Sequence, residues 1–106
     1  MIEIQDDFIR DLMLGFIKIH ILHHANKEEI YGTEFQEELA RHGYEISYGT
    51  LYPMFHKLIN LGLLTMTKKN VNGKIRKYYT ITPKGKEILS VCKEKSKELV
   101  DELFED

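Results

Sequence analysis

The stretch SYGTLYPMFHKLINLG, residues 47–62, predicts a helix whose first turns contain poor helix formers. Ser47 is a good N-terminal capping residue, and Gly62 stands where a glycine commonly ends a helix. Pro53 removes one backbone hydrogen bond and crowds the carbonyl group of Gly49, four residues earlier. Because Gly49 has no side chain, we expect the backbone to adjust there and the first turn to tip outward.

The two faces of this helix differ in chemistry. At 100° per residue, one face is apolar and is the expected core face: Leu51, Met54, Phe55, Leu58 and Leu61. The opposite face, with Tyr48 at its edge, holds Gly49, Tyr52, Pro53, His56, Lys57 and Asn60. Rings, an imidazole, an amide and one cation without an acid suit contact with base edges and phosphates. An ordinary solvated face is the alternative, although it would favour Glu and Lys.

The flanking segments predict a helix over residues 6–24, a short strand over 30–32 and a second helix over 34–41. The first helix has two adjacent apolar stripes, Phe8, Leu12, Phe16, Ile19 and Ile9, Met13, Ile17, Ile21. Two stripes are more than one core needs, so we expect this helix also to cover a second surface, such as another subunit. Thr33 and Gln36 predict a capping box for the second helix, and Gly43 predicts its end.

Residues 63–82 alternate apolar and polar side chains around Asn72-Gly73, a strong hairpin signal. A two-residue turn there pairs Leu64 with Ile81. Thr82 followed by Pro83 predicts the start of a last helix, over residues 84–104. The expected fold is therefore α+β, mostly α: a winged helix-turn-helix with a C-terminal dimerisation helix. We expect one compact unit, with residues 1–82 forming a DNA-binding domain and 83–106 the dimerisation helix.

The 106 residues suit one domain, and their net charge of −2 hides a strong segregation of charge. Residues 41–86 hold nine Lys or Arg and one acid, whereas residues 1–40 hold three and nine. A basic middle third indicates a polyanion partner, although a charge fluctuation on a solvated face is the alternative.

The hairpin concentrates this charge. In the expected register, Lys69 faces Arg76 and Lys68 faces Lys77, and directly opposed like charges destabilise a hairpin unless an anion neutralises them. With Lys74 near the tip, the wing is expected to follow a phosphate backbone.

The segments YGTEFQEEL, ISYGTLYPMFHKLINLGLL and KIRKYYTITPKGKEIL together resemble the PadR family of transcriptional regulators over roughly residues 10–90. The short C-terminus is similar to the subfamily with a single C-terminal helix. The resemblance implies a cytoplasmic homodimer that represses transcription, with the first and last helices at the interface. The DNA-binding residues we expect are Ser47, Tyr48, Gly49, Thr50, Tyr52, Pro53, His56, Lys57, Asn60, Lys68, Lys69, Lys74, Arg76 and Lys77.

An apolar stripe on the otherwise charged last helix agrees with dimerisation, unless that helix folds back on its own domain. The expected interface consists of Phe8, Leu12, Phe16, Ile88, Leu89, Cys92, Leu99, Val100 and Leu103. A two-fold dimer would place its two third helices about 34–36 Å apart, over successive major grooves of a palindrome.

Other features are less informative. Cys92 is the only cysteine, which excludes an internal disulfide and fits a reducing cytosol, and its redox role is disfavoured. The acidic N-terminus is unlike a signal peptide, and no apolar stretch could span a membrane. His20, His23 and His24 have helical ligand spacing, but metal binding is disfavoured because no acid or cysteine cluster accompanies them.

We therefore expect a sequence-specific regulator of double-stranded DNA, a repressor acting as a homodimer on a palindromic operator, without a cofactor. Paired tryptophans, which hold a ligand in one family member, are absent, and no effector is predicted. The alternative is a winged-helix protein-interaction module, which would not need opposed cations on the wing. An enzyme is not expected, because no nucleophile–base pair or phosphate-binding loop is present.

Overall fold

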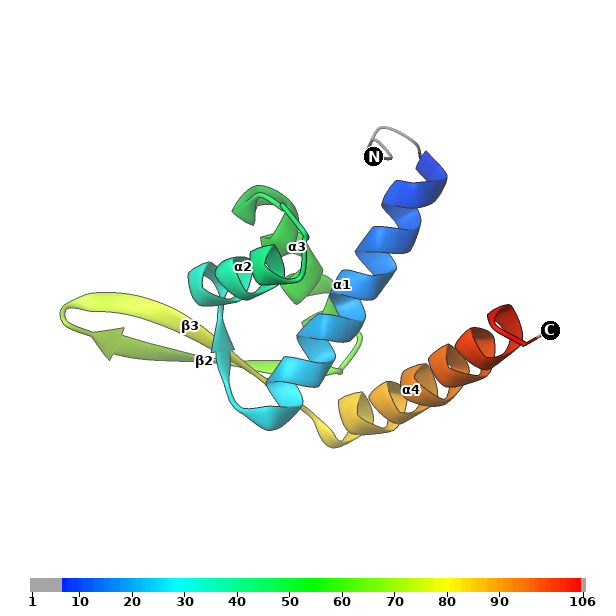
Figure 1. The fold of residues 1–106 in the computed structure, drawn as a ribbon. Coiled ribbons are helices and arrows are strands. Elements are labelled where there is room, and N and C mark those ends of the chain that lie inside the picture. Colours follow the sequence, from blue (N-terminus) through cyan, green and yellow to red (C-terminus); the bar gives the residue numbers. More distant parts are fainter. Residues whose placement is uncertain (1–6, 106) are drawn as a thin grey trace.

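A computed structural model describes residues 7–105, and the expectations that concern residues 1–6 and 106, including the outer limits of both predicted regions, lie outside these residues. The described elements are α1 (Asp7–Lys27), β1 (Ile30–Tyr31), α2 (Gly32–Arg41), α3 (Tyr48–Asn60), β2 (Leu64–Val71), β3 (Lys74–Ile81) and α4 (Pro83–Leu103). The hairpin and α4 project on different sides of a body formed by α1, α2 and α3 (Figure 1). The predicted mostly helical winged-helix fold is confirmed.

The wing has the predicted register. The sheet order is β1-β3-β2, all antiparallel, and Leu64 pairs with Ile81. Asn72 and Gly73 both have positive φ angles, as a tight hairpin turn requires. Leu64 and Tyr79 therefore face the core, and the distal half of the hairpin extends past it.

The core lies where α1, α2 and α3 meet the sheet. Ile21, Leu39, Leu51 and Phe55 are fully buried, and the Phe55 ring stacks on Tyr79 with centroids 4.2 Å apart. Leu61 was expected in this core but is 49% exposed, because α3 ends at Asn60 and the chain turns at the residues that follow.

Two predicted helix starts, at Ser47 and Thr82, and one predicted helix end, at Gly43, are confirmed. The Ser47 side chain accepts a hydrogen bond from the Thr50 N–H, and the Thr82 side chain accepts one from the Gly85 N–H. Gly43 has the positive φ of a helix-ending glycine, and its N–H donates to the Ala40 carbonyl group.

The predicted capping box of α2 is wrong. This helix begins at Gly32, before Thr33, and has no side-chain cap. A Cβ at residue 32 would overlap the Tyr48 ring, so tertiary packing selects the glycine at this start. Gln36 instead donates its side-chain N–H to the Ile46 carbonyl group at 2.9 Å.

The long helices extend beyond the core. α1 runs to Lys27, three residues further than predicted. Within the described residues, α4 buries only Gly85 and Leu89, and its remaining turns project from the body (Figure 1). Leu89 was expected at a dimer interface, but it is 4% exposed in the core of its own chain, which corrects that assignment. None of the described helices is long and apolar enough to cross a membrane.

Candidate nucleic-acid interface

The outward face of α3 carries the side chains that the sequence placed there. Four of the predicted residues are partly buried, namely Thr50, Tyr52, Arg76 and Lys77; the others, on α3, its cap and the wing, are exposed. None of the predicted DNA-binding residues is buried, so all of them are accessible to a partner.

Tyr52 connects α3 to the wing. Its hydroxyl group accepts a hydrogen bond from the Lys77 ammonium group, which also lies 4.7 Å from the centre of the Tyr52 ring. This hydrogen bond raises the pKa of Lys77 above its usual value, which keeps the side chain charged. The Tyr52 ring lies 5.5 Å from Tyr48 and 4.5 Å from His56. Helix and wing therefore form one continuous surface of rings and cations.

The opposed cations on the two faces of the wing differ in their partners. On the face toward α3, Lys68 is opposite Lys77, and within residues 7–105 no carboxylate lies within ion-pair distance of either. This pair is therefore the one that an external anion would neutralise.

The outer pair already has partners in the chain. Lys69 forms an ion pair with Glu29, and Arg76 lies 4.2 Å from the centre of the Tyr31 ring. Arg76 also donates to the Tyr78 hydroxyl group, which raises the pKa of Arg76. The expectation that both pairs depend on an external anion is wrong for this pair, because the loop before β1 supplies an acid.

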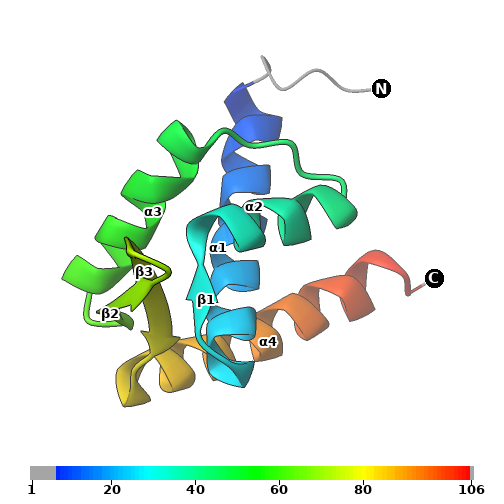
Figure 2. The ribbon, with the colours of Figure 1, turned by 90° about the vertical axis from the view of Figure 1, so that its left-hand side faces the viewer.

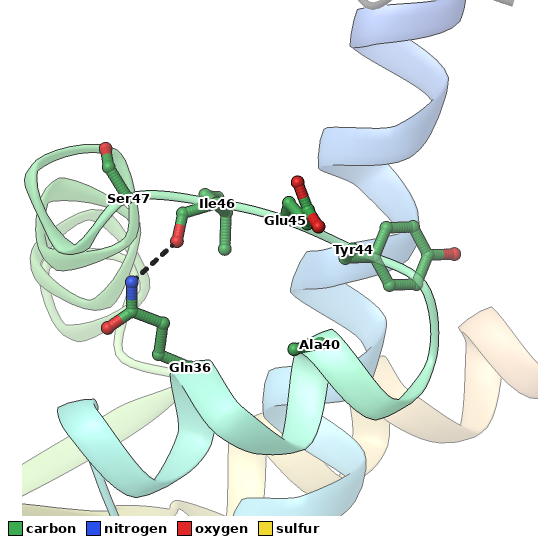
Figure 3. A pocket seen from close by; sticks show the side chains of 6 residues that line it. All are labelled: Gln36, Ala40, Tyr44, Glu45, Ile46 and Ser47. Carbon is green, nitrogen blue, oxygen red and sulfur yellow. Dashed lines mark hydrogen bonds between the residues drawn. The ribbon is translucent and has the colours of Figure 1, made fainter.

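A side chain of α2 holds the turn between α2 and α3 by a hydrogen bond. Gln36 and Ile46, joined by their hydrogen bond, line one side of a pocket that Ser47, the cap of α3, also lines (Figure 3). Ala40, Tyr44 and Glu45 complete the lining. This contact ties the position of α3 to α2.

A second exposed surface is apolar. On α1 it contains Leu12 and Phe16, which are half exposed, and Phe8, which is more so. On α4 it contains Ile88, Val91, Leu99, Val100 and Leu103, and Cys92 is partly buried beside it. Val91 was missed by the sequence analysis, although it lies on the same helix among the predicted residues.

Histidines gather at the C-terminal end of α2. The structure places His20 and His24 of α1 beside His42, so that one ring nitrogen from each lies within 4.8 Å of the others. His23 is not in this group, although the sequence spacing had joined it to His20 and His24. His42 was missed because it is distant in sequence, and only the packing of α2 on α1 brings it near.

The sequence is similar to those of known transcriptional regulators. Residues 21–91 match the model of the transcriptional regulator PadR-like family. A transcriptional regulator of Mycobacterium tuberculosis is 39% identical over 96 residues, which cover 91% of this chain and 90% of that protein.

Solved structures give the same result. A PadR family transcriptional regulator from Eggerthella lenta aligns with a TM-score of 0.76 and 30% identity, over 93% of this chain and 91% of that chain. A PadR-like transcriptional regulator from Bacillus cereus aligns with a TM-score of 0.76 and 31% identity, over 91% and 99%. The matched proteins are regulators and not enzymes, as the sequence predicted. The chain belongs to the PadR-like family of transcriptional regulators.

Proposed function

We propose that this regulator is a homodimeric repressor that binds a palindromic operator in the cytoplasm, with α3 in the major groove and the wing along the phosphate backbone. The observation that carries the proposal is the hydrogen bond between Tyr52 and Lys77. It joins the exposed face of α3 to the one opposed lysine pair of the wing that lacks an acidic partner among residues 7–105.

The shape of α3 supports close approach to a duplex. A Cβ at residue 49 would meet only the Ser47 hydroxyl oxygen at 3.8 Å, so nothing in the described chain requires a glycine there. Backbone N–H groups at the start of a helix can also bind a phosphate. A helix without side-chain bulk at this point can bring its backbone nearer to DNA.

Dimerisation follows from the apolar surface. Leu99 and Leu103 are 52% and 65% exposed, on a helix in which every residue from Lys93 to Leu103 is exposed. Exposed leucines in line on a projecting helix are typical of a protein interface. A second copy that covers α4 and the adjacent side of α1 would pair two α3 helices for a two-fold operator.

Selection of bound fragments from the organism's own genomic DNA tests the proposal. The expected result is an enriched palindrome with half-sites about one helical turn apart, protected symmetrically in footprinting. If the bound fragments share no sequence and the chain binds another protein instead, the proposal is overturned and the interaction module is supported.

A further inference from the structure

We propose that His20, His24 and His42, together with Glu38, form a binding site for a divalent transition-metal ion of the zinc class. None of these residues belongs to the proposed DNA surface or to the apolar interface. The site joins α1 to the C-terminal end of α2.

The helix geometry supplies two ligands. His20 and His24 are four residues apart on α1, a spacing that places two imidazoles on one side of a helix and is used by zinc sites. Their rings are stacked, with centroids 6.2 Å apart. Both side chains are partly buried, which restricts their motion.

His42 completes the group from the other side. It is the C-cap residue of α2, and its ring lies 4.7 Å from that of His20. Zinc–nitrogen bonds of about 2.0–2.1 Å place tetrahedral ligands about 3.3 Å apart. The three nitrogens are now within 4.8 Å of one another, and the exposed His42 side chain has room to close the remaining distance.

Glu38 is placed as a fourth ligand. Its Oε1 lies 3.7 Å from His24 Nε2 and 3.5 Å from His42 Nε2. Its other oxygen, Oε2, accepts a hydrogen bond from Arg41, so the carboxylate is oriented with Oε1 toward the imidazoles. Orientation of a ligand by such an outer partner is a common feature of metal sites.

The local electrostatics favour the metal-binding form. Burial, followed by the neighbouring histidines His42, His24 and His23, lowers the pKa of His20. Burial is also the main cause of the lowered pKa of His24, against the opposing effect of Glu38. Neutral imidazole is the form that binds a metal, so the lowered pKa values of His20 and His24 favour binding.

The site lies next to the turn of the helix-turn-helix. His42 directly precedes the turn that leads through Tyr44 to Ser47, and the Tyr44 ring lies 5.5 Å from that of His20. A bound ion would fasten this turn to α1. Metal bound to the native site then stabilises the fold by mass action.

Titration of the full-length protein with zinc chloride by calorimetry tests the site, with cobalt absorption as a second readout of coordination. We expect one ion per chain, a tetrahedral cobalt spectrum and a rise in melting temperature. His42→Ala should abolish the spectrum and the thermal shift and weaken zinc binding by more than about tenfold, because loss of even an outer partner of a ligand costs about that much.

His23→Ala is the matched control, because it removes a histidine of the same helix that lies outside the group, and it should bind zinc as the wild type does. Circular dichroism verifies that both variants are folded, and His20→Ala repeats the test on a second ligand if His42→Ala is unfolded. Equal binding by wild type and His42→Ala, or loss of binding in His23→Ala alone, would overturn the proposed site.

Discussion

α3 and α4 are both amphipathic helices that leave one face uncovered, but the chemistry of the two faces differs. The exposed face of α3 holds rings, an amide and one lysine, and the nearest segment continues it with lysines of the wing. The exposed face of α4 holds Leu99 and Leu103 among acids. In Figure 2, α3 and the wing lie together while the end of α4 points away from them.

The difference separates two kinds of partner. Aromatic and cationic groups without acids suit a polyanion, which the acids beside Leu99 and Leu103 would repel. Leucines flanked by charges suit another protein surface, because the apolar side chains are buried there and the charges remain in water. Changes to one face should therefore leave the other function intact, except where DNA affinity depends on the dimer.

The largest effect is expected from the double change Leu99→Glu and Leu103→Glu. Two charges in the apolar surface should convert the dimer to a monomer, because burying them without partners is costly. Light scattering should report the monomer mass, and operator affinity should fall by about a hundredfold or more, since specific binding by two half-sites is lost. Lys97→Glu is the control: it changes the net charge by the same amount on another side of α4, where Lys97 pairs with Asp101. A dimer that survives the double change would refute this interface.

The next effect separates the two faces of the wing. Lys77→Gln should weaken binding to all duplexes about tenfold. The slope of log affinity against log salt concentration should become less steep by about 0.9 for each phosphate that is no longer neutralised. Lys69→Gln should cost less, because Glu29 already compensates the charge of Lys69. Fluorescence anisotropy at several salt concentrations measures both. Equal effects of the two substitutions would show that the ion pair with Glu29 opens in the complex.

Tyr52 tests whether α3 reads bases. Tyr52→Ala should change the order of preference among operator variants, with about 1–3 kcal/mol of discrimination removed at one base pair. Tyr52→Phe retains the ring and removes only the hydroxyl group that Lys77 binds. Competition between operator variants measures the preference, and a uniform decrease for all of them would assign Tyr52 to phosphate contact.

The smallest effect is expected at Gly49. Gly49→Ala should leave the melting temperature unchanged or raise it, because space is open there and alanine favours a helix. Operator affinity should nevertheless fall several-fold, since the methyl group would separate the α3 backbone from the duplex. Calorimetry and anisotropy on the same sample decide this, and unchanged affinity would place Gly49 outside the DNA-binding surface.

Local signals predicted much of this fold. The Asn72-Gly73 turn and the alternation at Leu64–Thr67 and Tyr78–Ile81 predict the wing register. Ser47 and Thr82 act as caps because a cap needs only the residues that directly follow it. The predictions were wrong where contacts between segments distant in sequence determine the local structure. The start of α2 depends on the Tyr48 ring against Gly32.

Local signals also predicted which side chains of α3 are exposed. The exposed face of α3 follows from helical periodicity, and the structure leaves every residue predicted there accessible. The pairing of Lys69 with Glu29, 40 residues earlier, and the approach of His42 to α1 depend on the packed fold and have no local signal. Leu89 was misplaced because a helical stripe does not reveal where its helix leaves the core.

The salt dependence of operator binding tests the central claim most directly. Anisotropy titrations of the selected duplex at 50 and 200 mM salt should show affinity falling by about a thousandfold or more if the dimer contacts six or more phosphates through α3 and the wing. An affinity that is the same at both salt concentrations would contradict a DNA-binding role for this surface.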